Sequence, residues 1–487
     1  MLVQCYTIVC NQIFDSVRFA QEDSISWEAF MSRFSKLLIL LATIALVAAA
    51  CGTSDDTTTT TAADAQATTT TAAAQETTTT AEAMEPFVFA ASLPLTGDFA
   101  IPGQKHSDGY EFCVFEINRL GGLLGHEVVY VIDDNQSAPE QAVAQVQRHI
   151  DVDGADVLLG TFSSLLTFPA TTEALNAGMV YPVPSGGALR IWLRGYDNIF
   201  YFQQNAAEEI GFSPLAMIDY YVDQGIIDPA PTSVALVNAD DFFAGAIIKG
   251  LVGGDVPIPG TDDVVAIDGF LEGTGIEVVF QEEWPVPFTD WLTLANSMKN
   301  SEAEMIFAAT ASPDEAISLV NALATVDYNP KLLWMSQGAQ TEFLDTLGTN
   351  ANNVTVHGSW HPLANWTGTL AGEPYTNQDF IDNFTAWAGR APDEDEAIPF
   401  ALCQGMEQAV IGTGGTDNAE MAVWLHDRTA SDPVKTVLGD FYWDQRGLPI
   451  DRSLIMTQWQ DEVLEFVFPI DEFPGVVDVV YPKSDFE

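Results

Sequence analysis

The sequence predicts an α/β protein with two doubly wound parallel sheets. From residue 87 onward, short apolar runs alternate with helical segments, and the same alternation restarts near residue 233. Strands that are apolar on both faces and joined by helices are typical of parallel sheets. A chain of 487 residues is also long enough for more than one domain. We therefore expect two lobes with a cleft between them, and a ligand at the carboxyl ends of the strands.

The first lobe is expected to begin with a strand at 87–95. Further strands are expected at 127–133, 155–160 and 179–184. The intervening helices should include 110–118, start near Ala138 and start after Ser164, and the pair Gly121–Gly122 should end the first of them.

The second lobe repeats this pattern. Its expected strands are 233–239, 276–284, 304–310 and 331–337. Its helices should start near Phe243, Asp290 and Asp314.

The N-terminal part has the pattern of an export signal. Residues 37–50 form an apolar run too short for a comfortable membrane span, and Arg33 and Lys36 precede it. We interpret Met31 as the start, residues 31–50 as a signal peptide, and residues 1–30 as no part of the mature protein.

The end of this run, Leu46-Val47-Ala48-Ala49-Ala50-Cys51-Gly52, resembles the lipobox of bacterial lipoproteins. That resemblance implies that Cys51 is lipidated and becomes the first residue. The alternative is an ordinary signal peptide followed by an incidental cysteine.

Residues 51–85 contain three threonine runs separated by Ala, Asp, Gln and Glu. Such a segment buries too little apolar surface to offset the entropy of ordering, so we expect a flexible tether. An anchor followed by a tether predicts that the folded body lies outside the cytoplasmic membrane.

The charge balance excludes one class of partner. The chain has 69 Asp and Glu against 17 Lys and Arg, a formal charge of -52. Binding of nucleic acid requires a basic surface that releases counterions from phosphates, and this chain lacks one.

Metal, cofactor and catalytic patterns are not found in the sequence. Beyond residue 51 the cysteines are Cys113 and Cys403, which could form a disulfide or be two buried apolar side chains. His357 and His361 flank Gly358 and precede Pro362, so they do not form a helical metal-binding pair. The sequence also shows no nucleophile elbow and no phosphate loop. We expect the protein to bind no cofactor and to have no catalytic activity.

Several motifs together carry a family resemblance. These are Pro-Leu-Thr-Gly at 94–97, Glu-Ile-Asn-x-x-Gly-Gly at 116–122, LLGTFSS at 158–164, VALVNADDFFAGA at 234–246 and GDFYWDQRGLPI at 439–450. In order and spacing they resemble type I periplasmic binding proteins of the leucine/isoleucine/valine-binding family, over roughly residues 86–470. The resemblance implies a hinge that the chain crosses three times. Lobe one would then comprise 86–204 and 359–450, and lobe two 205–358 and 451–487.

The resemblance also implies ligand-binding positions on lobe one. Family members hold a carboxylate or amide with hydroxyls and backbone N–H groups at strand-to-helix turns. The matching positions are Ser163, Ser164, Ser185, Gly186 and Gly187. For Ser164 the alternative is an ordinary helix N-cap, and we favour ligand contact. Gly187 stands where amino-acid binders commonly have threonine, which weighs against a standard amino-acid ligand.

On lobe two the family's amino-acid binders pair an acidic residue with the ligand ammonium. Asp314 occupies that place, although an Asp in the first turn of a helix is also stabilised by the helix dipole alone. Four further residues are candidates for the walls of the cleft: Phe243, where many members have Tyr, and Phe99, Pro102 and Trp360. Their alternative role is packing in the protein core.

These observations predict a monomeric, extracytoplasmic, lipid-anchored binding protein. It would capture a small polar or amphipathic molecule, such as an amino acid, an amide, a urea derivative or a small carboxylate. It would deliver this molecule to the permease of an ABC importer. The alternative is a receptor of the same fold that signals to a membrane partner without transport.

Overall fold

The computed structural model describes residues 84–452 and 455–486. The expected signal peptide at 31–50, the lipidated Cys51 and all of the tether up to residue 83 lie outside the described residues, as do residues 1–30. No helix in the part of the chain that is described is both long and apolar enough to cross a membrane.

For description we keep the predicted names, lobe one for 86–204 and 359–450 and lobe two for 205–358 and 451–486. The lobe-one elements are β1 (Phe87–Leu93), α3 (Ala100–Arg119), β2 (Val128–Asp134), α4 (Pro139–Asp151), β3 (Val157–Leu159), α5 (Ser164–Asn176), β4 (Tyr181–Val183), α6 (Leu189–Trp192), β5 (Ile199–Tyr201), β13 (Thr367–Leu370), β14 (Glu373–Thr376), α13 (Asn377–Ala388), α14 (Glu394–Thr413), α15 (Asn418–His426), β15 (Val434–Thr436) and β16 (Gly439–Phe441).

The lobe-two elements are α7 (Ala207–Ile210), α8 (Phe212–Asp223), β6 (Ser233–Ala239), α9 (Phe242–Val252), β7 (Gly254–Pro257), β8 (Val264–Ile267), β9 (Glu277–Trp284), α10 (Trp291–Ser301), β10 (Met305–Ala309), α11 (Pro313–Thr325), β11 (Leu332–Met335), α12 (Thr341–Leu347), the 3-10 helix η1 (Gly348–Ala351), β12 (Val354–Gly358), β17 (Ile455–Gln460) and β18 (Val463–Phe468).

Lobe one is built around parallel strands in the order β2-β1-β3, with β4 and β5 forming a second parallel pair. The strand β1 is an apolar run whose last five residues are buried, as expected for a strand covered on both faces. Its following helix α3 ends before Gly121 and Gly122, which both have positive φ. Glycine is favoured there because it adopts this backbone conformation without steric cost.

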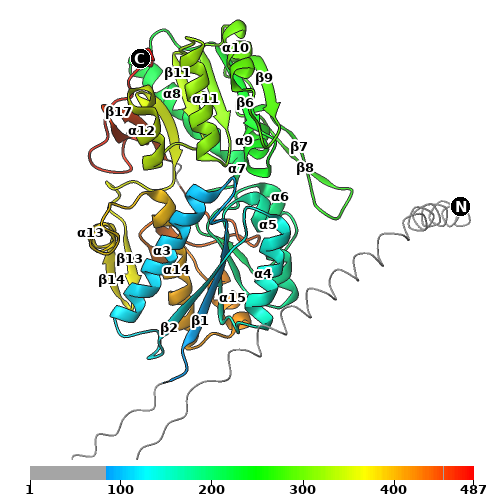
Figure 1. Cartoon of the computed structure of the whole chain (residues 1–487), viewed down its shortest axis with the longest axis vertical. Helices are drawn as coiled ribbons and strands as arrows, with labels where there is room; N and C mark the ends of the chain where they lie inside the picture. Colours follow the sequence, from blue (N-terminus) through cyan, green and yellow to red (C-terminus); the bar gives the residue numbers. More distant parts are fainter. Residues whose placement is uncertain (1–83, 453–454, 487) are drawn as a thin grey trace, which may run out of the picture. The chain divides into compact units, whose positions relative to one another are not determined.

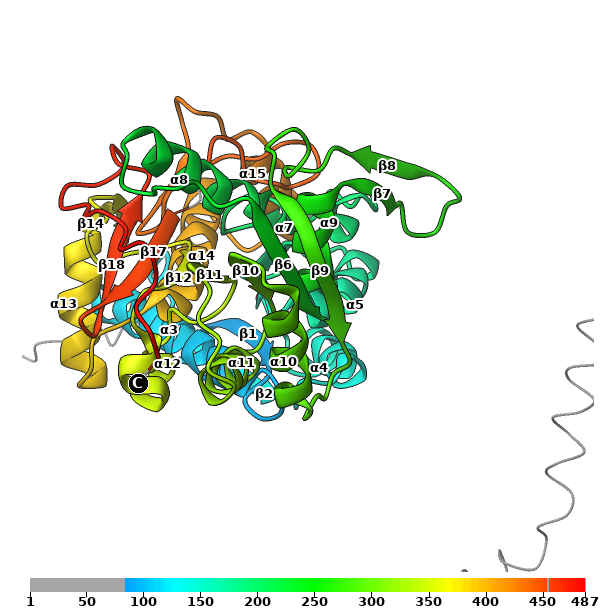
Figure 2. The same cartoon turned by 90° about the horizontal axis from the view of Figure 1, so that it is seen from above.

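Lobe two has one seven-stranded sheet in the order β18-β17-β12-β11-β10-β6-β9 (Figure 2). Neighbouring strands from β9 to β12 run parallel, while β17 and β18 add an antiparallel edge. The fold is therefore α/β with a parallel-sheet core in each lobe, as predicted.

The chain passes between the two sheets three times. Strands β1 to β5 belong to the lobe-one sheets, β6 to β12 to the lobe-two sheet and its side hairpin, β13 to β16 again to lobe one, and β17 and β18 again to lobe two. The elements gather accordingly into two groups in Figure 1. Each lobe is thus made from separated parts of the sequence.

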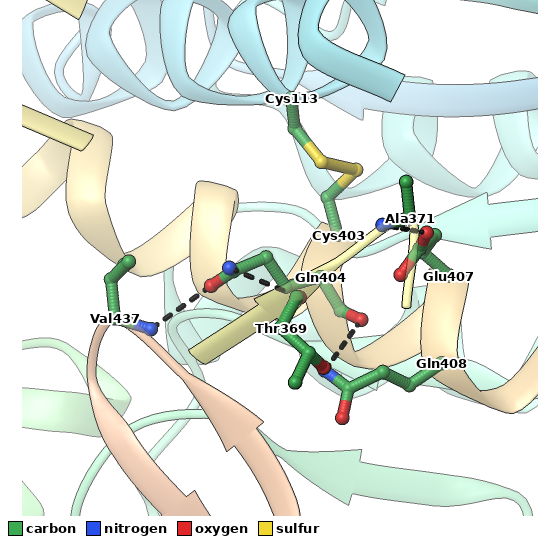
Figure 3. The surroundings of a disulfide bond; sticks show 8 residues. All are labelled: Cys113, Thr369, Ala371, Cys403, Gln404, Glu407, Gln408 and Val437. Carbon is green, nitrogen blue, oxygen red and sulfur yellow. Dashed lines mark hydrogen bonds between the residues drawn. A yellow bond between two sulfur atoms is a disulfide. The ribbon is translucent and has the colours of Figure 1, made fainter. Parts of the chain in front are cut away.

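The helices α3 and α14 pack closely inside lobe one. A disulfide joins Cys113 on α3 to Cys403 on α14, with 6.3 Å between their Cα atoms (Figure 3). At Gly109 a Cβ atom would overlap the backbone carbonyl oxygen of Glu396, so glycine allows the two helices to approach. This contact fixes the start of α14, which contributes to the site described next.

Candidate functional site

A cavity lies between the two lobes at the carboxyl ends of their strands. Its empty volume is about 470 Å³, part of which is open to solvent. The lobe-one lining comprises Phe162, Ser163, Ser164, Ser185, Gly186, Tyr201, Gln203, Glu394 and Asp395. The lobe-two lining comprises Phe243, Ala311, Ser336, Gln337 and His357. Strand-to-helix turns supply most of these residues, which is where open parallel sheets bind ligands.

Ser163 and Ser164 lie in the turn between β3 and α5. Ser164 is the first residue of α5, and its Oγ accepts a hydrogen bond from the Ala188 backbone N–H at 3.2 Å. The Oγ of Ser163 is buried and has no hydrogen-bond partner in the described part of the protein. Ser164 therefore ties two turns together, while the hydroxyl of Ser163 is free to contact a ligand.

Ser185 and Gly186 come from the turn after β4. The Ser185 Oγ lies 3.1 Å from the Nε2 of His106, a buried side chain of α3. Burial lowers the pKa of His106 to about 3, because desolvation disfavours the charged imidazole. The Ser185 side chain is thus positioned by a hydrogen bond to a neutral histidine.

Gly187 is not part of the cavity lining. A Cβ at this position would lie 3.0 Å from the Tyr201 Oη and 3.2 Å from the Ala207 backbone nitrogen. A threonine would not fit there without movement of its neighbours. The ring of Tyr201, whose hydroxyl donates to the Gln203 Oε1 at 2.5 Å, instead lines the cavity at this side.

An apolar cluster from both lobes stands beside the cavity. It is formed by Phe99, Ala142, Phe162 and Leu166 of lobe one and Ala311 of lobe two, and the partly buried Phe243 packs against it. The rings of Phe99 and Phe162 are 5.7 Å apart. Of these aromatic rings, Phe162 and Phe243 line the cavity, while Phe99 lies on the other side of the cluster.

The start of α14 brings two carboxyl groups to the cavity. The Glu394 Oε2 accepts from the Ser359 backbone N–H at 2.8 Å. The Asp395 Oδ2 accepts from the Nε2 of Gln340, a lobe-two residue, at 2.9 Å. Desolvation by burial, with the Asp395 carboxylate nearby, raises the pKa of Glu394 to about 8. Desolvation and the Asp393 carboxylate raise the pKa of Asp395 to about 7.

His357 lines the cavity from strand β12. Burial lowers its pKa to about 4, so the imidazole is neutral near pH 7. Its Nδ1 is buried and has no hydrogen-bond partner among the described residues. Buried polar atoms are normally paired, so this nitrogen and the Ser163 Oγ are both available to a ligand in the cavity.

Asp314 and Phe99 line a second hollow at the outer edge of the cleft, of about 900 Å³, and not the inner cavity. Asp314 is exposed in the first turn of α11. Trp360 is buried in the lobe-one core, where its Nε1 donates to the Asn377 Oδ1 at 2.7 Å. The structure thus brings together Ser163, Ser164, Ser185, Gly186 and Phe243 at one cavity and places Phe99, Gly187, Asp314 and Trp360 elsewhere.

Sequence reasoning missed Glu394, Asp395, His357 and the polar residues Tyr201, Gln203, Ser336 and Gln337. The run Asp393-Glu394-Asp395-Glu396 after Pro392 was a visible signal, because four adjacent acids are costly unless something offsets their charge. The others gave no signal, since single polar residues near strand ends are common.

One group of possible metal ligands lies outside the cavity. Asp133, His149 and Asp153 bring their ligand atoms within 4.8 Å of one another. Arg148 forms ion pairs with both aspartates, at 2.8 and 3.3 Å. The arginine already supplies the positive charge that a metal would bring to this cluster.

Comparison with known proteins agrees with this architecture. Residues 86–462 match the model of the family described as periplasmic binding protein. An amino acid binding protein of Pseudomonas aeruginosa is 24% identical over 384 residues, which cover 78% of this chain and 92% of that protein. Leu/Ile/Val-binding protein homolog 1 of Brucella melitensis is 22% identical over 371 residues, with 76% and 89% covered.

A solved structure has the same fold. It is the branched-chain amino acid transporter substrate-binding protein LivJ from Streptococcus pneumoniae, in complex with isoleucine. The TM-score is 0.64 at 19% identity, and the match covers 79% of this chain and all of that one.

Proposed function

Because the chain belongs to the periplasmic binding protein family, and to its type I, leucine/isoleucine/valine-binding branch, we propose that it captures a small polar or amphipathic solute in the inner cavity and delivers it to the permease of an ABC importer. The observation that carries the proposal is the position of the cavity between two lobes, lined by serines of two strand-to-helix turns and by residues at helix starts. Contacts made with both lobes at once would favour a closed arrangement over an open one.

The proposed ligand contacts on lobe one are Ser163, Ser164, Ser185 and Gly186. The first turn of α5 offers backbone N–H groups that have no partner inside the helix, together with the positive end of the helix dipole. Phe243 would cover the ligand from lobe two. These groups suit an oxygen atom of a solute beside a small apolar portion.

The extracytoplasmic position of the family agrees with the signal peptide expected at 31–50. We further propose lipid anchoring at Cys51. A Cys51→Ala variant expressed in bacteria should leave the membrane fraction, and equal membrane association of both forms would contradict the anchor.

A solute panel tests capture itself. Amino acids, amides, urea derivatives and small carboxylates should include at least one compound that raises the melting temperature, because a ligand that binds only the folded form stabilises it by RT ln(1 + [L]/Kd). Calorimetry on that compound then gives the affinity.

Ser164→Ala is the matching variant. Loss of a hydrogen bond to a charged ligand group should weaken binding roughly tenfold to more than a hundredfold. The variant also leaves the buried Ala188 N–H unpaired, at a cost of about 1–3 kcal/mol of stability. Ser301→Ala, in α10 away from the cavity, serves as the control. A lowered melting temperature with unchanged affinity would limit Ser164 to a structural role.

A further inference from the structure

The two carboxyl groups at the start of α14 differ from their acidic neighbours in having no cation of their own. Lys105 of α3 forms ion pairs with both Asp393 and Glu342, the latter at 3.0 Å. Within the described residues, no Lys, Arg or His ion pair involves Glu394 or Asp395.

The remaining nearby cation is also engaged. Arg390 forms ion pairs with Asp108 and Glu396, both at 2.6 Å. Neither Lys105 nor Arg390 lines the cavity, and no Lys or Arg is found among the described residues that line it. The two carboxyl groups therefore face the cavity with no ion pair of their own among the described residues, and the positive charge of Lys105, which also acts on Asp395, is shared with Asp393 and Glu342. Ionising both groups away from water is costly in this setting.

The rest of the lining offers neutral hydrogen-bond partners. The Ser163 Oγ and the His357 Nδ1 have no hydrogen-bond partner in residues 84–452 and 455–486, and both residues are more than nine-tenths buried, with exposed fractions of 4% and 6%. Each of these atoms accepts a hydrogen bond in one of its states, the histidine as the tautomer protonated at Nε2. They are suited to an N–H group of a ligand.

Asp395 also lies at a contact between the two lobes. Its carboxylate accepts from Gln340, whose Nε2 additionally donates to the Gln337 Oε1 of the cavity lining at 2.8 Å. Lys105 and Glu342 form a second contact between the lobes beside it. A ligand bound at Asp395 would thus touch the place where lobe one meets lobe two.

From this arrangement we infer that the cavity selects a small organic cation, an amine, amidine or guanidine with net positive charge, which the Glu394 and Asp395 carboxylates hold at the start of α14. The inference rests on the proposed solute-binding function and names the solute class. It differs from the expectation that Asp314 pairs with the ammonium of a zwitterionic amino acid.

The experiment compares three charge types on the same apolar group. The first set is 2-methylbutylamine, isoleucine and 3-methylpentanoate, and the second is benzylamine, phenylglycine and phenylacetate. Calorimetry should show that each amine binds at least tenfold more tightly than its zwitterion, with the carboxylate weakest. A zwitterion or carboxylate that binds as tightly as its amine would overturn the inference.

The variants Asp395→Asn and Glu394→Gln keep one acceptor oxygen, replace the other with an NH2 group and remove the charge. Each should weaken binding of the amines roughly tenfold to a hundredfold, because a hydrogen bond to a charged group is lost. Glu407→Gln is the matched control. Glu407 is a buried glutamate of the same helix that accepts from the Ala371 N–H at 2.7 Å, away from the cavity (Figure 3). Equal losses in all three variants would overturn the assignment.

The pH dependence gives a second readout. Alkylamines stay protonated below about pH 10, whereas Glu394 and Asp395 lose their protons as the pH rises through about 8 and about 7. Amine affinity should therefore rise roughly tenfold or more between about pH 5.5 and 8, and less in Asp395→Asn. The other charged or titratable groups near this pair are Asp393, Lys105, Glu342 and His357, and His357 is neutral throughout this range.

The outcomes separate this inference from the proposed function. If the wider solute panel yields ligands but none is a cation, the cation proposal fails and solute capture stands. If no compound of either panel raises the melting temperature, both fail.

Discussion

The starts of helices α11 and α14 look alike in sequence and differ in the structure. Both begin with a proline nearby and acids in the first turn, Asp314 and Glu315 in α11 and Glu394, Asp395 and Glu396 in α14. Asp314 is exposed at the outer edge of the cleft, whereas Asp395 is buried at the inner cavity with an exposed fraction of 4%. The comparison teaches that an acid at a helix start has no defined role until its distance from the opposite lobe is known.

The surroundings of the two helices explain this difference. The Ser312 side chain caps α11 by accepting from the Glu315 N–H, and Glu315 accepts from the Thr310 hydroxyl at 2.6 Å. The first turn of α11 is therefore satisfied within lobe two. The start of α14 has a capping box of its own, formed by Asp393 and Glu396. It is also held from outside, by Lys105 of α3, by the close approach at Gly109 and by the disulfide at Cys403 in the middle of the helix.

Removal of the disulfide should disturb α14 most. The bond joins residues 290 positions apart, so it restricts the unfolded chain strongly, and replacing both Cys113 and Cys403 with serine should lower the free energy of unfolding by about 2–5 kcal/mol. Urea unfolding of the folded body measures this loss. An unchanged midpoint would mean that α3 and α14 hold together by packing alone.

The buried acids of α14 should also make the stability of the protein depend on pH, with a smaller effect than removal of the disulfide. The folded-state pKa values of Glu394 and Asp395, about 8 and about 7, lie above their unfolded values. The native form then binds more protons, so their contribution to stability is complete below about pH 4 and is lost as the pH rises to about 8.

The ligand-free protein should accordingly melt at a lower temperature at pH 8 than at pH 5.5. In Asp395→Asn the loss over this range should be roughly 1–3 kcal/mol smaller. Glu208 and Glu407, whose pKa values burial raises to about 7, act in the same direction and should leave part of the slope in place. Parallel pH profiles of variant and wild type would contradict a raised pKa of the buried Asp395 carboxyl group.

The smallest effect is expected at α11. Asp314→Asn removes a favourable interaction with the helix dipole and should cost about 0.3–1 kcal/mol of stability. Its effect on the affinity for 2-methylbutylamine should be well below that of Asp395→Asn, as calorimetry can measure. A larger loss in Asp314→Asn would return the cation contact to α11, where the sequence first suggested it.

Much of the fold was predictable because it depends on local patterns. The apolar runs at 87–93 and 233–239 are strands, and the helix starts near Ala138, Ser164 and Asp314 lie within two residues of α4, α5 and α11. Strand periodicity, capping residues and glycine stops act over a few residues, so a single sequence reveals them. The antiparallel edge of β17 and β18 was not predicted, since it depends on pairing with the distant strand β12.

The residues of the site likewise fall into those that local sequence patterns predicted and those that depend on tertiary contacts. The sequence by itself determined that serines stand at two strand-to-helix turns, at Ser163, Ser164 and Ser185, and that Asp314 stands in the first turn of a helix. Only the tertiary structure decided that Tyr201 fills the space beside Gly187, that Trp360 is a core residue, and that Glu394 and Asp395 line the same cavity as His357. The physical reason is that a capping or turn preference is a property of neighbouring residues. Burial and the absence of an opposing charge, by contrast, depend on which chain segments the two lobes bring together.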